Sequence, residues 1–147
     1  MVHENGRVIS YLDRIRASGR DANPFFALMD IDVISLGPGR ASIRMKIRED
    51  MLNGEQYLQG GLFTALADEA MVLAIYSVLE PGQTLATISE STSFMRGAGA
   101  GTVLVAEGQV IKKGRRVAFA EGIVTIEGKE DILSRTTAAF AISAKNA

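Results

Sequence analysis

The chain of 147 residues has no cysteine and no tryptophan, and it contains a single histidine. Without cysteine there are no disulfides, thiolate nucleophiles, zinc–thiolate sites or iron–sulfur clusters. The one histidine, His3, lies in the N-terminal tail, where chains are usually poorly ordered. We therefore expect neither a Ser-His-Asp triad nor a bound metal, and any acid–base chemistry falls to a carboxylate, a lysine or a tyrosine.

A strong net charge and a membrane-spanning segment are also absent. Sixteen basic and 17 acidic residues leave a formal charge of -1, so no basic field attracts nucleic acid or an anionic membrane. The longest apolar segment, Leu62 to Leu79, is interrupted by Asp68 and Glu69, which are costly in a bilayer. Residues 1–20 lack the apolar stretch of a secretory signal. These absences predict a cytoplasmic protein that binds neither nucleic acid nor membrane.

The residues that are present fit a single domain, 1–147. Hydrophobic residues make up 47% and charged residues 22%, an ordinary globular balance. Residues 1–22 are predicted as a tail and a short amphipathic helix that ends at Gly19, because apolar residues recur there at helical spacing (Val8, Leu12 and Ile15). The pair Asn23-Pro24 then predicts a turn.

Strand-like patterns flank one long apolar helix. Alternating or β-branched runs predict strands at residues 31–34, 41–47, 84–95, 102–112, 117–126 and 133–142. Short glycine-containing turns favour antiparallel pairing. The segment Leu62 to Leu79 is apolar nearly all round, so protein must surround it. This order predicts an α+β fold in which a curved antiparallel sheet of about six strands wraps a central helix. Any face left open requires a partner, so we expect an oligomer.

Asp68 is the most informative residue of that helix. A carboxylate in the middle of an apolar helix is desolvated, which raises its pKa and makes it basic enough to activate water. It shares a helix stripe with small residues that leave space for a ligand (Gly61, Thr64 and Ala65). A structural hydrogen bond to a loop or subunit is an equally good explanation. Glu69 points elsewhere, to a salt bridge or a subunit contact.

The segment before the helix, Gln59-Gly60-Gly61, provides backbone amides that are unpaired at a helix start. Glycine lets a ligand atom approach them, so the segment fits an oxyanion hole or, more simply, a permitted turn. The side-chain amide of Asn53 could donate to the same oxygen or stabilise the loop. Basic residues beside glycines could bind phosphates or form solvated turns: Arg96, Lys113 and Arg115.

These residues together resemble the hotdog-fold thioesterases of the phenylacetate-degradation (PaaI-like) type. That pattern reads Asn, two residues, Gly, two residues, His-Gly-Gly, and then an acidic residue nine positions beyond the His. Asn53, Gly60, Gly61 and Asp68 match it. The resemblance extends over roughly Pro24 to Ile142, which is far more than a short motif.

The resemblance implies a hotdog fold assembled as a homodimer or homotetramer, with an acyl-CoA thioester at the subunit interface. It implies that the Gly60 N–H and the Asn53 amide polarise the thioester carbonyl, with Asp68 as general base or nucleophile and Thr87 assisting. Arg96, Lys113 and Arg115 would bind the phosphates of coenzyme A. Coenzyme A is part of the substrate, and no separate cofactor is implied.

Two residues depart from the pattern: Gln59 stands at the His position and Gln56 at the Gly position. Glutamine hydrogen-bonds but exchanges no proton near neutral pH. Because the base and the backbone donor are retained, we favour an acyl-CoA thioesterase. The alternative is a non-catalytic protein that binds acyl-CoA or an acyl carrier.

Overall fold

The computed structural model describes residues 3–4 and 7–144, with side chains from Ile9 onward. Its helices are α1 (Tyr11–Ser18), α2 (Pro24–Met29) and α3 (Gly60–Tyr76), with the 3-10 turns η1 (Gly19–Ala22) and η2 (Glu49–Met51). Six strands form one sheet: β3 (Asp32–Gly37), β4 (Arg40–Lys46), β5 (Thr84–Phe94), β6 (Val103–Lys113), β7 (Val117–Ile126) and β8 (Ile132–Ser143). The pair β1 (His3–Glu4) and β2 (Arg7–Val8) is separate from that sheet.

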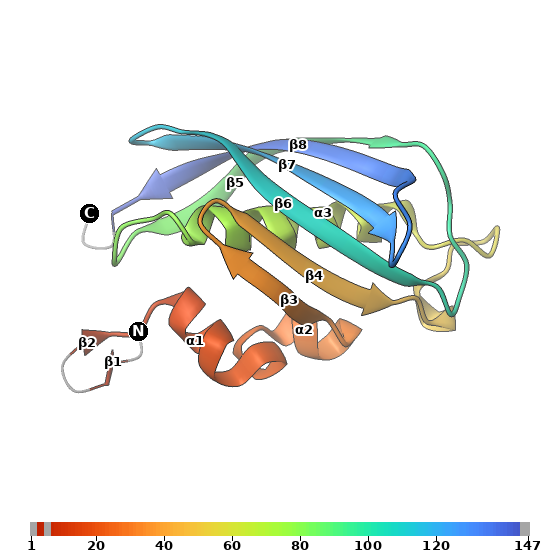
Figure 1. The fold of residues 1–147 in the computed structure, drawn as a ribbon, viewed down its shortest axis with the longest axis horizontal. Coiled ribbons are helices and arrows are strands. Elements are labelled where there is room, and N and C mark those ends of the chain that lie inside the picture. The colour runs from red at the N-terminus through yellow and green to blue at the C-terminus, as the bar shows by residue number, and fades with distance from the viewer. Residues whose placement is uncertain (1–2, 5–6, 145–147) are drawn as a thin grey trace.

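The sheet is antiparallel throughout and has the order β3-β4-β6-β7-β8-β5. Figure 1 shows it curving over α3, with α1 and α2 gathered at one side near β3. One face is apolar: β4 alternates between buried and more exposed residues along its length, and its buried side chains join those of α3 in a single core. The predicted α+β arrangement of six strands around a central helix is confirmed. In this order β5 and β3 are the edge strands.

Two glycines let α3 lie almost in backbone contact with the sheet. A Cβ atom at Gly108 on β6 would overlap the carbonyl oxygen of Ala70, and one at Gly122 on β7 would come within 2.9 Å of the Ala67 side chain. Real Cβ atoms essentially never approach so closely, so these positions require glycine. The side of α3 against β6 and β7 therefore has no room for a ligand.

The N-terminal region differs from the sequence prediction. Ser10 and Asp13 form a capping box that starts α1 after Val8, which belongs to β2 instead of the helix. The predicted turn at Asn23-Pro24 is the start of helix α2: the Asn23 side chain accepts hydrogen bonds from the N–H groups of Phe25 and Phe26. Proline fits the first helical position because its missing N–H has no helical partner there.

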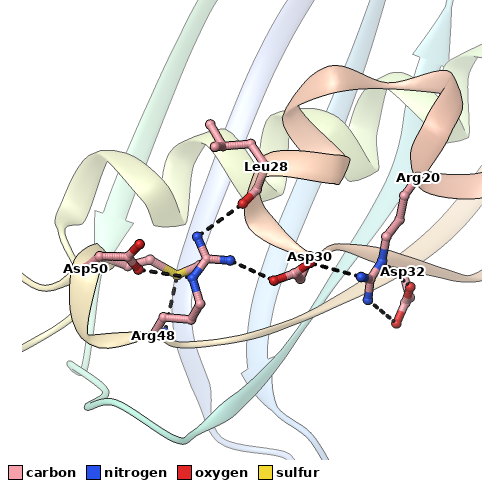
Figure 2. Close-up of polar contacts among 7 residues, drawn as sticks. Arg20, Leu28, Asp30, Asp32, Arg48 and Asp50 are labelled. Atoms are coloured by element: carbon pink, nitrogen blue, oxygen red, sulfur yellow. Dashed lines mark hydrogen bonds and ion pairs between the residues drawn. The ribbon is translucent and has the colours of Figure 1, made fainter.

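An ion-pair network connects this N-terminal region to the segment that leads into α3 (Figure 2). Arg48, just after β4, bonds Asp30 at 2.9 Å, Asp50 at 3.0 Å and the Leu28 carbonyl at 3.1 Å. Arg20 bonds the same Asp30 and also Asp32. Asp30 ends α2 in a left-handed conformation (φ 55°), which points its carboxylate between the two guanidinium groups.

Across the described ranges of the chain, no helix combines the length and the apolar character needed to cross a membrane.

Candidate active site

Asp68 lies in the middle of α3, on the side that faces edge strand β5. It is half-buried, and the Thr87 hydroxyl of β5 donates a hydrogen bond of 3.3 Å to its Oδ1. The structure therefore brings together two residues that are 19 positions apart in the sequence and that the resemblance pairs. A carboxylate that is held by one hydroxyl and remains open to solvent can accept a proton from a water molecule.

Glu69 points away from Asp68 and toward the N-terminal helices. Its Oε2 accepts a hydrogen bond of 3.3 Å from the Asn23 side-chain amide, which also donates to the Tyr11 hydroxyl at 2.8 Å. Burial, and then the charge of Asp68, raise the pKa of Glu69 to about 7 against a smaller lowering by the Asn23 bond. Within the described residues an amide, and not a cation, contacts this carboxyl, so the predicted salt bridge does not form; the alternative, a subunit contact, stays a prediction.

Strand β5 runs antiparallel to α3 along the Asp68 side. Gly60 lies beside Phe94, with 3.6 Å between a Cβ built at Gly60 and the ring. The hydroxyls of Thr64 and Thr92 are 2.8 Å apart, and the Asp68–Thr87 bond follows one helical turn later. This side of α3 thus faces an aromatic ring at its start and hydroxyl groups from Thr64 to Asp68, in contrast to the side against β6 and β7.

The start of α3 has the geometry of an anion site. Gln59 is the N-cap residue, and its exposed side chain makes no capping bond. Within the described residues, the backbone N–H groups of Gly60 and Gly61 have no hydrogen-bond acceptor. A Cβ at Gly61 would meet nothing within 4 Å, so the N–H groups are open to an incoming oxygen.

The loop before α3 is held by Asn53. Its Oδ1 accepts from the N–H groups of Glu55 at 2.9 Å and Tyr57 at 3.2 Å, so the loop-stabilising interpretation is correct for the oxygen. The Nδ2 group has no acceptor among the described residues and remains available to a ligand. Gln56 has a φ of 67°, in the left-handed region that favours glycine, which explains why the family pattern has glycine at this position.

The three basic residues predicted to bind phosphates, Arg96, Lys113 and Arg115, do not all lie close together within one chain. The Arg96 N–H bonds the carbonyl of Leu133 at one end of β8, whereas Arg116, beside Arg115, bonds Ile142 at the other end. Nine residues of strand separate these two points by roughly 30 Å. Arg96 is exposed and lies 3.8 Å from Asp131, and Lys113 and Arg115 are exposed in the β6–β7 turn. One chain cannot bring all three to one phosphate group.

A pocket of about 370 Å³ opens beside strands β5, β6, β7 and β8; it contains none of the predicted site residues, and Glu90 of β5 is one of its lining residues. It is lined by Ser89, Glu90, Ser91, Ile111, Phe119, Ala120, Thr137, Ala138 and Ala139. The alternation of β8 places Thr137 and Ala139 opposite the buried Ala138, so this hollow lies outside the core.

Sequence reasoning missed Glu90 on β5. Its carboxyl hydrogen-bonds that of Asp68; burial first, and then this bond and the charge of Asp68, raise the pKa of Glu90 to about 7. The available signal was an acidic residue inside a Ser/Thr-rich strand that follows a helix carrying another acid.

Comparison with known proteins identifies the family. A family model described as "Thioesterase superfamily" matches residues 55–142. "Acyl-coenzyme A thioesterase PaaI" of Escherichia coli is 35% identical over 101 residues, which are 67% of this chain and 66% of that protein. Human "Acyl-coenzyme A thioesterase 13" is 29% identical over 105 residues, 71% of this chain and 74% of that protein. The chain thus spans about two thirds to three quarters of these relatives.

A solved structure agrees with both findings. A mutant of the phenylacetic acid degradation protein PaaI from Thermus thermophilus superimposes with a TM-score of 0.74 at 28% identity, covering 81% of this chain and 98% of that one. The match of the family model covers more than half of the sequence. This chain belongs to the Thioesterase superfamily, and its predicted identity as a PaaI-like thioester hydrolase with a hotdog fold is confirmed.

Proposed function

We propose that this protein hydrolyses acyl-CoA thioesters, with Asp68 as the group that activates water or attacks the carbonyl carbon. The observation that carries the proposal is the half-buried Asp68 carboxylate, held by the Thr87 hydroxyl on the open edge of the sheet. The names of the curated relatives support acyl-CoA as the substrate class. The unpaired N–H groups at the start of α3 provide donors for an oxyanion.

A single chain does not complete this site. Gly60 and Asp68 are eight residues apart on α3, which is about 12 Å along a helix. The oxyanion donors and the base must both lie within about 3 Å of groups on one reacting carbonyl and its water. Gly60 and Asp68 of the same helix cannot do both at once, so the proposed site takes Gly60 from one subunit and Asp68 from another.

Edge strand β5 provides the contact between the two subunits. Among the described strands it pairs with β8 alone, and it exposes large apolar side chains, with Ile88 57% and Phe94 56% accessible. An unpaired edge of 11 residues readily pairs with a second copy. Antiparallel pairing of two β5 strands about a point between Glu90 and Ser91 places Phe94, with its neighbour Gly60, opposite Thr87 and Asp68 of the partner. A homodimer of this kind has two identical sites.

The same pairing reunites the separated basic residues. Arg96 follows the end of β5, and the β6–β7 turn with Lys113 and Arg115 lies near its beginning, through β8. In an antiparallel pair of β5 strands, the end of one lies near the beginning of the other. Arg96 of one subunit and Lys113 and Arg115 of the other then flank one opening, where they can bind the phosphates of coenzyme A.

Mixing two inactive variants tests the shared site. Asp68→Asn removes the base, and Gly60→Pro removes one N–H at the first helical position, which proline tolerates. The Gln59 backbone (φ -54°, ψ 129°) is already compatible with a following proline. Each variant alone should release no thiol from acyl-CoA. When the two variants are refolded together in equal amounts, half of the dimers contain one copy of each. Each mixed dimer has one intact site out of two, so about a quarter of the wild-type activity should return.

Gly60→Ala is the matched control because it keeps the N–H and its Cβ would meet the Phe94 ring at an ordinary 3.6 Å. It should retain activity within a few fold. Failure of the mixture to regain activity, with each variant folded and dimeric by ultracentrifugation, would contradict a site built from two subunits. If the wild-type protein binds acyl-CoA in calorimetry but releases no thiol, the result would instead support the alternative function, a non-catalytic acyl-CoA-binding protein. Gln59 at the His position would then be the first residue to test as the cause.

A further inference from the structure

Glu90 lies beside Asp68 because of a bulge in β5. The pairing of β5 with β8 shifts between Thr87 and Ser89, so the extra residue Ile88 is unpaired. Beyond the bulge, Glu90 is opposite Ala138, which is buried in the core that the sheet shares with α3, and Thr92 is opposite the buried Thr136. Glu90 therefore shares its side of the strand with Thr92 and faces the helix.

Two hydroxyl contacts fix this stretch of β5 against α3 on either side of Glu90. The Thr92 Oγ1 lies 2.8 Å from the Oγ1 of Thr64 and 2.8 Å from that of Thr136. The Thr87 Oγ1 donates to Asp68 at 3.3 Å. Because Thr64 and Asp68 are one helical turn apart, Glu90 lies on the strand between their two partners and next to the Asp68 carboxylate.

The Glu90 carboxyl lies close enough to that of Asp68 for a hydrogen bond between them. Carboxylates only accept hydrogen bonds, so such a bond requires a proton on one of them. Burial, followed by the bond to Asp68 and its negative charge, raises the pKa of Glu90 to about 7. Near neutral pH Glu90 therefore keeps its proton in about half of the molecules and can donate it to Asp68. The other titratable group next to the pair is Glu69, which faces Asn23 on the far side of Asp68.

We propose that Asp68 and Glu90 form an acid–base pair in which Asp68 takes a proton from the attacking water and Glu90 donates one to the leaving sulfur. The proposal deepens the thioesterase function and rests on it. Glu90 is exposed in the single chain, so a bound thioester can reach its carboxyl.

The proton and electron balance closes without a further reactant. Water forms a C–O bond with the carbonyl carbon and gives its proton to Asp68, while the carbonyl electron pair moves to the oxygen, which accepts a hydrogen bond from the Gly60 N–H of the other subunit. The C=O bond then re-forms, and the C–S bond breaks with its electrons on sulfur. The sulfur takes the proton of Glu90, which yields an acid and a thiol. Transfer of the proton from Asp68 to Glu90 through their hydrogen bond restores the starting state.

A comparison of leaving groups separates this role from a positioning role. An alkyl thiol such as coenzyme A is a basic leaving group that benefits from a proton, whereas 4-nitrothiophenol leaves as a stable thiolate. Glu90→Gln keeps the shape and hydrogen-bonding capacity and removes the acid. We expect it to lower kcat for acyl-CoA by about 100-fold and kcat for the 4-nitrophenyl thioester of the same acyl group by less than about threefold.

The pH dependence of kcat is a second test of the acid role of Glu90. As the pH rises through about 7, Glu90 loses its proton, so wild-type kcat for acyl-CoA should fall. The fall should be absent with the aryl thioester and in Glu90→Gln. The matched control is Glu55→Gln, which changes an exposed carboxyl in the loop before α3 and should behave as wild type with both substrates.

The other possible results each contradict one part of the proposal. Wild-type rates in Glu90→Gln with acyl-CoA, or equal losses with both thioesters, would overturn the acid role. Asp68→Asn should lose both activities, and its retention of either would remove Asp68 from the pair. If the wild-type protein hydrolyses neither thioester, the proposed function itself fails, and the pair fails with it.

Discussion

Asp68 and Glu69 are consecutive residues of one helix with opposite surroundings. Asp68 faces edge strand β5, where it contacts a hydroxyl and a second carboxyl and remains open to solvent. Glu69 faces α1 and the start of α2, and its partner is the side-chain amide that also caps α2. Helix geometry separates neighbours by about 100°, so two identical charges one residue apart enter different environments.

The difference shows what makes a carboxyl suitable for chemistry in this fold. Burial raises the pKa of Glu69 to about 7, but the groups around Glu69 already connect it to Asn23 and through Asn23 to Tyr11. Asp68 is on the side that a substrate and a second subunit can approach. A raised pKa by itself therefore does not identify the functional residue, because access and the neighbouring proton donors decide between the two.

The largest expected effect separates the two residues by activity. Asp68→Asn should lower kcat for acyl-CoA by about 1,000-fold, because the amide keeps the shape and cannot accept the proton of water. Glu69→Gln should stay within about threefold of wild type, because its side chain faces the N-terminal helices. Thiol release by both variants, measured side by side with circular dichroism of each, tests the pair. A loss of activity in Glu69→Gln as deep as that in Asp68→Asn would break the comparison.

The second-largest expected effect is on the stability of the fold, and it concerns Glu69. The pKa of Glu69 is raised to about 7 in the folded protein, above the 4.5 of a free glutamate. Between these values the folded state binds more protons than the unfolded state, so stability falls as pH rises from about 4.5 to 7 and then levels off. Glu69→Gln removes this loss and should be more stable than wild type at pH 8 by on the order of 2 kcal/mol, with no gain at pH 4.

Urea unfolding at pH 4, 6 and 8 measures this difference. Glu130→Gln, at an exposed turn, is the control and should follow the wild-type curve at every pH. A gain for Glu69→Gln that is equal at pH 4 and pH 8 would show that its origin is packing and not the ionisation of this carboxyl.

The sheet and the central helix could be predicted from the sequence because their signals are local. Four strands after α3 begin and end within about two residues of the predicted limits, since β-branched runs and glycine turns mark them directly. Helix α2 could not be predicted in this way. Asn23-Pro24 is compatible with a turn and with a helix start, and the choice depends on Asn23 reaching the Phe25 and Phe26 amides.

The candidate site was predictable only in part, for a related reason. The family pattern carried Asp68 and Thr87 to positions that the structure brings into contact. Glu90 depends on the strand register: strict alternation from Thr87 would turn Ser89 toward the helix and Glu90 away from it, and the bulge at Ile88 reverses this. The pairing of Glu69 with Asn23, 46 residues earlier, likewise depends on tertiary packing that no local pattern records.

The smallest effects come from one hydroxyl beside each carboxyl. Thr87→Val keeps the branched shape and removes the donor to Asp68, so it should lower kcat about fivefold and leave stability nearly unchanged at this exposed position. Tyr11→Phe removes the acceptor for the Asn23 amide, so it should cost about 1 kcal/mol of unfolding free energy and leave kcat unchanged. Urea unfolding and thiol release measured on both variants give four numbers. If Tyr11→Phe lowers kcat while Thr87→Val lowers only stability, the assignment of chemistry to the β5 side of α3 is reversed.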